Sequence, residues 1–235
     1  MAVYAISDLH LPLSVDKNMN VFGDAWEGYV DKIRLNWESK INNDDFIIIP
    51  GDISWAMNIN EAYNDFKYIN SLPGIKFISK GNHDFWWTTR AQLESYCNEN
   101  NFNSIKFIHN SCEIADEFTI CATKGYMSEN LGAQYSDHDR MLFDRELGRL
   151  KFSLDLARAK GRENIVVALH YPPFDLVGNA SDFIFIMKEY GVNLCIYGHL
   201  HSEGIKRAVE GYHEGIQFKL ISSDALKFDP FKLAL

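Results

Sequence analysis

The chain has 235 residues, of which 46% are hydrophobic and 23% are charged, so it can bury a core and is neither disordered nor fibrous. Its 32 Asp and Glu outnumber its 23 Lys and Arg, which gives a formal net charge of -9. This balance argues against a general binder of nucleic acids or anionic membranes, because both partners attract an excess of Lys and Arg.

Short apolar runs along the chain predict strands. They cover residues 3–6, 46–49, 75–78, 105–108, 118–121, 165–169, 194–197 and 216–221. Since the runs lack polar alternation, we expect strands that are buried on both faces. Segments with apolar residues at helical spacing predict helices over residues 29–41, 62–69, 89–98, 144–160 and 181–190. Strands that alternate with helices predict an α/β fold, and about eight strands favour two packed sheets.

No repeat, low-complexity tract or Pro/Gly/Ser-rich linker divides the chain, so we expect a single domain over residues 1–235. Residues 124–139 are a long polar stretch without clear periodicity, which predicts a functional loop. An early strand-like run and the lack of any apolar run near ~18 residues predict no signal peptide and no membrane span. The four cysteines form no CxxC pair, which favours reduced thiols and a cytoplasmic protein.

The turns that follow five of the predicted strands carry Asp, Asn or His. They are Asp8-Leu9-His10, Gly51-Asp52, Gly81-Asn82-His83-Asp84, His170, and Gly198-His199-Leu200-His201. Ligands of α/β proteins gather at the carboxyl ends of strands, so we expect these side chains to converge. The glycines before Asp52, Asn82 and His199 would let the backbone turn sharply there.

The mixture of carboxylate, carboxamide and imidazole groups suits divalent ions such as Mn²⁺, Fe²⁺ or Zn²⁺. Seven candidate ligands are too many for one tetrahedral ion, but they suit two ions that share a bridging carboxylate. A pair of ions at such spacing can hold the attacking and leaving oxygens of a phosphoryl displacement. The sequence therefore predicts a dinuclear metal centre.

Taken in order, the motifs Asp-x-His, Gly-Asp, Gly-Asn-His-Asp, a single His after an apolar strand, and Gly-His-x-His resemble those of the calcineurin-like metallophosphoesterase superfamily. They span residues 8–201. The resemblance implies a four-layer α/β/β/α sandwich with two packed mixed sheets. It implies that one ion is bound by Asp8, His10 and His201, that the other is bound by Asn82, His170 and His199, and that Asp52 bridges them. It also makes His83 the catalytic histidine beside the scissile phosphate, with Asp84 following it. The resemblance leaves open what orients His83, and Asp84 is a candidate for that role.

Trp55 departs from two branches of that superfamily. The purple acid phosphatases have a metal-binding Tyr at this position, and an indole cannot ligate a metal. The Ser/Thr protein phosphatases have an Asp followed by a phosphate-binding Arg, whereas Ala56 follows Trp55 here, and their Gly-Asn-His motif ends in Glu rather than Asp84. These departures argue against the purple acid phosphatase branch and weaken the protein-phosphatase interpretation.

The sequence predicts a metal-dependent hydrolase of phosphate mono- or diesters that acts on a small phosphorylated substrate. In it, a hydroxide bound to the two divalent ions would attack phosphorus while His83 assists the leaving group. The alternative is a nuclease or a cyclic-nucleotide phosphodiesterase on the same metals, but a nuclease needs a basic groove and the Lys and Arg positions form no dense cluster. A non-catalytic binding module of the same fold is a second alternative, although all seven ligand positions hold suitable residues.

Outside the motifs, the signals are weaker. Trp55, Trp86 and Trp87 would either line the pocket or pack beneath it. Arg90 and Arg140 could clamp a phosphate, yet an exposed surface position is the better interpretation of each. We expect His109, His138 and His213 to be structural, with the alternative that His138, in the 124–139 stretch, reaches the rim of the site.

Overall fold

The protein folds as two β-sheets packed face to face, and the computed structural model describes residues 1–17, 19–127, 136–161 and 163–234. The first sheet has the order β11-β1-β2-β3-β4, in which only β11 is antiparallel to its neighbour. Its strands are β1 (Val3–Ala5), β2 (Phe46–Pro50), β3 (Ile75–Ser79), β4 (Ile105–Phe107) and β11 (Phe231–Lys232). Four adjacent parallel strands thus direct their carboxyl ends toward the same edge.

The second sheet has the order β5-β6-β7-β8-β10-β9, with antiparallel pairs at both edges and parallel pairs in the middle. Its strands are β5 (Ser111–Ala115), β6 (Phe118–Thr123), β7 (Ile165–Leu169), β8 (Leu194–Tyr197), β9 (Gly211–His213) and β10 (Ile216–Leu220). Both sheets are therefore mixed, as expected.

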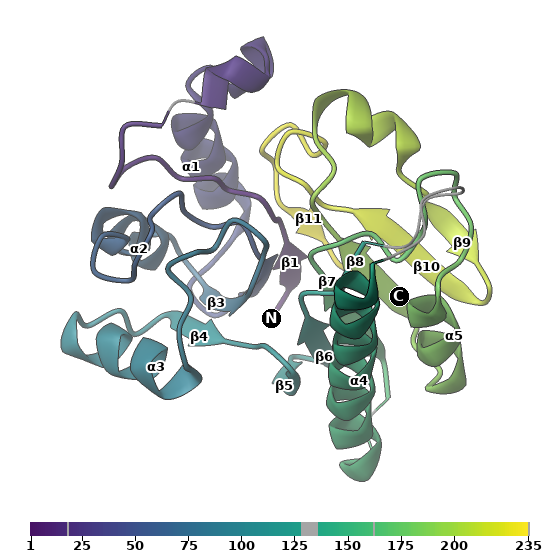
Figure 1. Ribbon diagram of the computed structural model, residues 1–235. Helices are drawn as coiled ribbons and strands as arrows, with labels where there is room; N and C mark the ends of the chain where they lie inside the picture. Colours follow the sequence, from purple (N-terminus) through teal and green to yellow (C-terminus); the bar gives the residue numbers. More distant parts are fainter. Residues whose placement is uncertain (18, 128–135, 162, 235) are drawn as a thin grey trace.

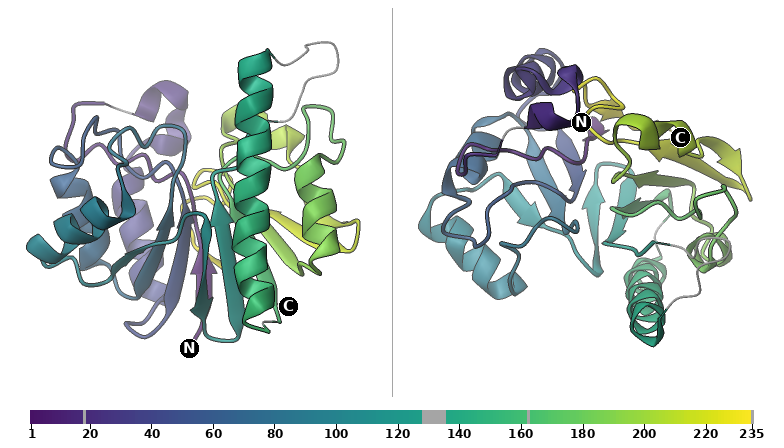
Figure 2. Two further views of the ribbon diagram at one scale, coloured as in Figure 1. Left: turned by 60° about the horizontal axis from the view of Figure 1, so that its bottom comes forward. Right: turned by 45° about the horizontal axis from the view of Figure 1, so that its top comes forward.

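Helices cover the outer face of each sheet (Figures 1 and 2). The first sheet is covered by α1 (Tyr29–Lys40), α2 (Tyr63–Ser71) and α3 (Arg90–Glu99), and the second by α4 (Asp137–Ala159) and α5 (Asp182–Glu189). Three short 3₁₀ helices, η1 (Met19–Phe22), η2 (Asp24–Trp26) and η3 (Ser202–Arg207), lie in the connections. The layers follow the order helix, sheet, sheet, helix, which confirms the predicted α/β/β/α sandwich.

Three apolar layers explain why the strands lack polar alternation. In β1, Val3 and Ala5 pack between the two sheets, whereas Tyr4 packs against the helices of the first sheet. In β7, Val166 faces the other sheet and Val167 faces α4 and α5. Both faces of these strands are thus removed from water, and each fully buried aliphatic side chain contributes about 1.5–3 kcal/mol.

Three strands, β5, β9 and β11, were not predicted. They are edge strands in antiparallel pairs, and β9 carries polar or exposed residues. Such strands form because a neighbouring strand offers hydrogen bonds, and a local apolar pattern is not needed.

Helix α4 begins seven residues earlier than its apolar pattern predicts, at Asp137. Its first turn is polar and exposed, and the Ser136 side chain caps it by accepting a hydrogen bond from the Asp139 backbone N–H at 3.1 Å. The expectation of a loop over residues 124–139 is therefore wrong at its end. Residues 128–135 of that stretch lie outside the described residues.

The two sheets are joined by hydrogen bonds at the edge where the motif turns lie. The Ser7 backbone N–H donates to the Ile221 carbonyl at 2.9 Å, and the Ser223 N–H donates to the Ser7 carbonyl at 3.0 Å. Ser7 follows β1 of the first sheet, and Ile221 follows β10 of the second. This pairing holds the carboxyl ends of strands from both sheets together.

All four cysteines are buried and unpaired. Among the described residues, no helix has both the length and the apolar character that a membrane crossing requires.

Candidate metal centre

The five motif turns meet where the carboxyl ends of β1, β2 and β3 face those of β7 and β8. Their backbones bond directly to one another: Asp8 N–H donates to the Gly51 carbonyl, and His10 N–H donates to the Asp52 carbonyl, both at 3.0 Å. In the other sheet, Gly198 N–H donates to the His170 carbonyl at 3.1 Å. The turns thus form one hydrogen-bonded unit, and the convergence expected from the sequence is present.

Four of the predicted ligands have left-handed backbone conformations. The φ angles are 58° at Asp8, 43° at His10, 54° at Asp52 and 71° at His199. Such angles are uncommon for residues other than glycine and cost on the order of 1–3 kcal/mol each. Strain of this kind persists only where the surrounding structure imposes it, and it gathers at functional sites.

Two glycines allow the turns to approach the carboxylates closely. A Cβ atom at Gly81 would collide with the Asp52 backbone and carboxylate, and one at Gly198 would collide with the side chains of Ser7 and Asp8. Any larger residue at either position would displace a predicted ligand. This supports the role that the sequence analysis gave to the glycines before the ligands.

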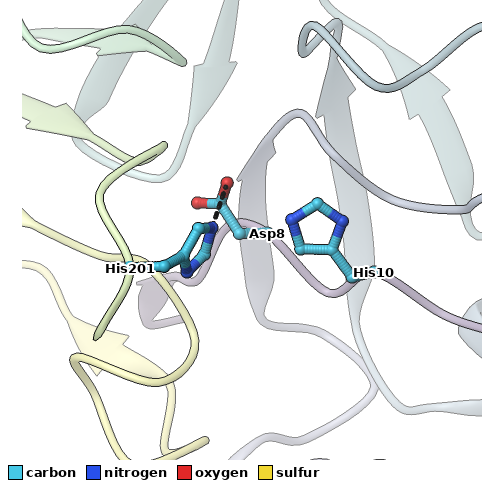
Figure 3. A group of neighbouring side chains, drawn as sticks. All are labelled: Asp8, His10 and His201. Atoms are coloured by element: carbon cyan, nitrogen blue, oxygen red, sulfur yellow. Dashed lines mark hydrogen bonds and ion pairs between the residues drawn. The ribbon is translucent and has the colours of Figure 1, made fainter. Parts of the chain in front are cut away.

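The first compact group of donor atoms consists of Asp8, His10 and His201 (Figure 3). One ligand atom from each lies within 4.8 Å of the others, and His201 Nε2 is 3.3 Å from Asp8 Oδ1. Within the described part of the chain, the buried His10 Nδ1 has no hydrogen-bond partner. The opposite ring nitrogen, Nε2, is on the side that faces Asp8 (Figure 3) and lies 3.7 Å from Asp52 Oδ2, so it is the His10 nitrogen placed to bind a metal ion. These three residues are the set predicted for one ion.

The second compact group consists of Asp8, Asp52 and His170, again within 4.8 Å. Asp52 Oδ2 lies 3.5 Å from His170 Nε2 and 3.7 Å from His10 Nε2, so this carboxylate faces ligands of both predicted ions. Its position suits a bridge, although Asp8 is the residue that the two groups share.

Asn82 and His199 lie beside these groups, though neither belongs to them. Asn82 Oδ1 is 2.6 Å from His170 Nε2, and the His199 ring centroid is 5.1 Å from that of His170. The other His170 nitrogen, Nδ1, is 3.2 Å from the Pro50 carbonyl, which directs Nε2 toward Asn82 and Asp52. The structure thus brings all seven predicted ligands into one neighbourhood.

Burial decides the charge state of most of the histidines. It lowers the pKa of His170 to about 3 and that of His199 to about 4, and it lowers the pKa of His10 well below its ordinary value. These three rings are therefore neutral near pH 7 and offer the lone pairs that metal ligation requires.

Burial also favours the neutral form of the two buried carboxylates. Burial raises the pKa of Asp52 well above its usual value, and the nearby carboxylates of Asp84 and Asp8 raise it further. Burial opposes ionisation of Asp8 too, but neighbouring histidines, His201 first, hold its pKa below the usual range. A buried site in which carboxylates repel one another is stabilised by a bound cation.

Asp224 is a site residue that the sequence analysis missed. Its Oδ1 lies 2.8 Å from His201 Nδ1, while the opposite nitrogen of His201 faces Asp8. Burial would lower the pKa of His201, but Asp8 and Asp224 raise it to about 10. A carboxylate behind a histidine fixes the ring orientation of many metal ligands. The signal was present in the sequence, because Asp224 closely follows an apolar run, as the other motif residues do.

Trp55 packs against two imidazoles of the site. Its ring is stacked on His10, with centroids 4.6 Å apart, and its centroid is 4.8 Å from that of His83. Lys17 Nζ covers the indole at 3.3 Å from the ring centroid. Trp55 thus supports His10 and His83 from outside the donor set, and Trp86 is buried in the same apolar cluster.

Asp84 fastens two motif turns to each other. Oδ2 accepts hydrogen bonds from the backbone N–H groups of Asp52 and Gly81, and Oδ1 accepts from Ile53 N–H and the Trp86 indole, at 2.7–3.0 Å. His83 is held through its backbone, whose N–H donates to Asp52 Oδ1 at 2.8 Å. The contacts of Asp84 with the two turns therefore make it a positioning residue for Asp52 and the 81–83 turn.

Arg90 and Arg140 form ion pairs on exposed helical surfaces. Arg90 Nε lies 2.7 Å from Glu94, and Arg140 Nη2 lies 3.1 Å from Asp144. The surface interpretation of both arginines fits these contacts.

Comparison with known proteins identifies the protein family to which this chain belongs. The family profile described as calcineurin-like phosphoesterase matches residues 1–203, and the chain belongs to this family. Among proteins with curated functions, none matches the sequence significantly.

Solved structures share the fold at low identity. The phosphopantetheinyl hydrolase PptH from Mycobacterium tuberculosis superposes with a TM-score of 0.58 at 14% identity, over 99% of this chain and 95% of that chain. The protein TT1561 from Thermus thermophilus superposes with a TM-score of 0.51 at 14% identity, over 84% of this chain and 80% of that chain. These matches confirm the α/β/β/α sandwich of the metallophosphoesterases.

Proposed function

We propose that the protein hydrolyses phosphate mono- or diesters with two divalent ions, of the Mn²⁺, Fe²⁺ or Zn²⁺ kind. The proposed ligands are Asp8, His10, Asp52, Asn82, His170, His199 and His201. The observation that carries the proposal is the pair of compact groups, Asp8–His10–His201 and Asp8–Asp52–His170, in a chain of the calcineurin-like phosphoesterase family. When bound, the ions would supply an activated water and neutralise charge on the phosphoryl group.

The residues of the chain fit such ions by their chemistry. The neutral imidazoles of His10, His170 and His199 and the buried carboxylates are donors that these metals accept, and His201, whose pKa is raised to about 10, would release its proton on binding an ion. Asp224 would hold the His201 ring in place, and Trp55 would hold the His10 ring. The ligands are thus oriented before any ion binds, which limits the entropy lost on binding.

His83 is the proposed catalytic residue outside the ligand set. Its half-buried ring lies 5.7 Å from that of His10, so it stands beside the proposed ions. Burial lowers the pKa of His83, and the Lys17 charge lowers it further. A neutral His83 keeps one N–H, which can donate a hydrogen bond to the transferring phosphoryl group or to the leaving oxygen.

The test is reconstitution of the purified chain after chelation. Hydrolysis of p-nitrophenyl phosphate and of bis-p-nitrophenyl phosphate should vanish without metal and return with Mn²⁺, Fe²⁺ or Zn²⁺. Saturating metal should also raise the melting temperature, because ions at 100 times their Kd add about 2.7 kcal/mol to the stability. Full activity in a demonstrably metal-free sample would refute the proposal, as would an unchanged melting temperature together with no activity in every metal.

A further inference from the structure

A pocket lined by basic side chains lies beside the candidate metal centre. The residues that we call the basic pocket are Lys80, Lys124, Arg145 and Arg149, and Trp87, His109, Asn110 and Glu146 complete its lining. The cavity has a volume of about 250 Å³. Its cations follow β3 and β6 or belong to α4, so they are far apart in the sequence. The sequence-based statement that Lys and Arg form no dense cluster is therefore wrong in three dimensions.

The basic pocket carries an excess of positive charge. Among the described residues, Glu146 is the one carboxylate that lines it. Glu146 pairs with Arg149 Nη1 at 2.5 Å and accepts a hydrogen bond from Thr123 at 2.8 Å. Lys80, Lys124 and Arg145 have no ion-pair partner within residues 1–17, 19–127, 136–161 and 163–234. Adjacent cations repel one another, so this arrangement is unfavourable unless an anion occupies the pocket. The excess is unusual in a chain whose net charge is -9.

The basic pocket borders the side of the metal centre formed by Asn82, His170 and His199. Lys80 comes two residues before Asn82, and the Lys124 carbonyl accepts a hydrogen bond from His170 N–H at 3.1 Å. Lys124 Nζ lies 5.6 Å from the Tyr171 ring centroid, and that ring lies 4.4 Å from the His199 ring. The Tyr171 ring thus lies between Lys124 and the proposed ligand His199.

We propose, on the basis of the function proposed above, that the basic pocket binds a second phosphate group of the substrate. The substrate class is then a small bisphosphate, with one phosphate ester cleaved at the metal centre and the other held by Lys80, Lys124 and Arg145. A guanidinium offers paired N–H donors to phosphate oxygens, and the two ammonium groups supply further charge-assisted donors. The enclosed volume suits a single phosphate group better than a nucleic-acid backbone, which requires an extended groove.

The first experiment measures anion binding without metal, so that it does not depend on activity. Inorganic phosphate is titrated into the chelated full-length chain and followed by calorimetry. Arg145→Gln and Lys124→Gln should each weaken binding about tenfold, the typical effect of one lost charge-assisted hydrogen bond. Lys151→Gln is the matched control, because Lys151 lies on the same helix but forms an exposed pair with Asp155. Arg149 is left intact, since its removal would strand the buried Glu146.

The second experiment compares matched substrates of the metal-loaded protein. Fructose 1,6-bisphosphate is set against fructose 6-phosphate, and adenosine 3′,5′-bisphosphate against adenosine 5′-monophosphate. In at least one pair, kcat/KM should favour the bisphosphate by about tenfold or more, mainly through KM. Arg145→Gln and Lys124→Gln should reduce that preference by a similar factor, whereas Lys151→Gln should retain it.

The outcomes separate the two proposals. The protein could hydrolyse p-nitrophenyl phosphate, show no preference for bisphosphates and bind phosphate equally in all variants. That result would refute the proposal that the basic pocket binds a second phosphate, and it would support the proposed phosphoesterase function. Phosphate binding that depends on Arg145 and Lys124 in a protein inactive with every metal would support the pocket as an anion site and refute the hydrolase. Faster cleavage of a single-stranded oligonucleotide than of either bisphosphate, with the same variants reducing it, would replace the small substrate by a nucleic acid and overturn the inference.

Discussion

The candidate metal centre and the basic pocket are neighbours, yet they are built in opposite ways. The predicted ligands of the metal centre all lie in short turns that directly follow strands. The basic pocket draws its cations from two turns and from helix α4, across residues 80–149. A residue that follows a strand is positioned by its place in the sequence, because the strand end fixes where the chain leaves the sheet. A side chain on a helix reaches a site only if that helix packs against the sheet in the right orientation. Local motifs therefore reveal the first site and not the second.

The two regions also handle charge differently. In the metal centre, buried carboxylates lie beside histidines, most of which are neutral, and Asp52 is held at a raised pKa by burial and by its acidic neighbours. In the basic pocket, cations predominate and Arg145 is exposed. One region is suited to binding cations and the other to binding anions, which is the arrangement that a substrate with two phosphates would need.

The largest expected effect comes from Asp52, the carboxylate proposed to bridge the two ions. Asp52→Asn should reduce the metal content of the purified protein and lower kcat/KM by at least about 10³-fold, because the ions supply several kcal/mol of transition-state stabilisation. Metal analysis alongside kinetics measures both effects. Asp144→Asn, at an exposed pair on α4, is the control and should behave as the wild type. Two ions per chain and normal activity in Asp52→Asn would remove Asp52 from the proposed ligands.

His83→Asn should separate catalysis from metal binding. Both ions should remain, while kcat should fall by ~10²–10⁴-fold, the usual contribution of a positioned proton donor. A nitrophenyl ester should lose less than an alkyl ester, since its leaving group needs little protonation. Equal losses for the two esters would leave His83 as a hydrogen-bond donor to the phosphoryl group, and loss of an ion would make it a ligand. His213→Asn, at an exposed histidine of β9, controls for the substitution itself.

Asp224→Asn tests the residue that orients His201. The change keeps the shape of the side chain but removes the charge beside His201 Nδ1, so the affinity for metal should fall by about 10–100-fold. Competition with a fluorescent chelator measures that affinity. Asp229→Asn serves as the control, because Asp229 pairs with Lys40 on the surface. Unaltered affinity in Asp224→Asn would mean that packing alone orients His201.

The smallest expected effect concerns His109, which faces Arg149, Lys80 and Lys124 in the basic pocket, beside Glu146. Burial, with a smaller contribution from these cations, lowers the pKa of His109 to about 3. An unfolded chain binds a proton at His109 below pH ~6.5, while the native chain does not until near pH 3. The free energy of unfolding should therefore decrease as the pH falls through this window, by on the order of 1 kcal/mol per pH unit at most.

Urea unfolding of chelated protein between pH 4.5 and pH 7 measures this dependence. His109→Gln should have a shallower slope than the wild type, and His213→Gln should match the wild type. Identical slopes in all three proteins would show that the basic pocket does not hold His109 neutral.

Several features could be predicted from the sequence because they are local. The apolar runs located eight of the strands, and the fixed order of motif turns located the ligands, because a residue that directly follows a buried parallel strand must emerge at the carboxyl edge of the sheet. Periodicity located the five α-helices in the described part of the chain, although the polar start of α4 was missed because Asp137 and its neighbours contact water rather than the core.

Other features were decided only by the tertiary structure. Edge strands such as β9 exist because a partner strand offers its hydrogen bonds, and Asp224 orients His201 because the pairing of Ser7 with residues 221 and 223 brings the end of β10 to the end of β1. The charge excess of the basic pocket likewise appears only when α4 packs against β6. The apolar pattern and the residues at strand ends can be recognised from consecutive residues of the sequence. The side chains that support or adjoin a site come together only through contacts between elements that are distant in the chain.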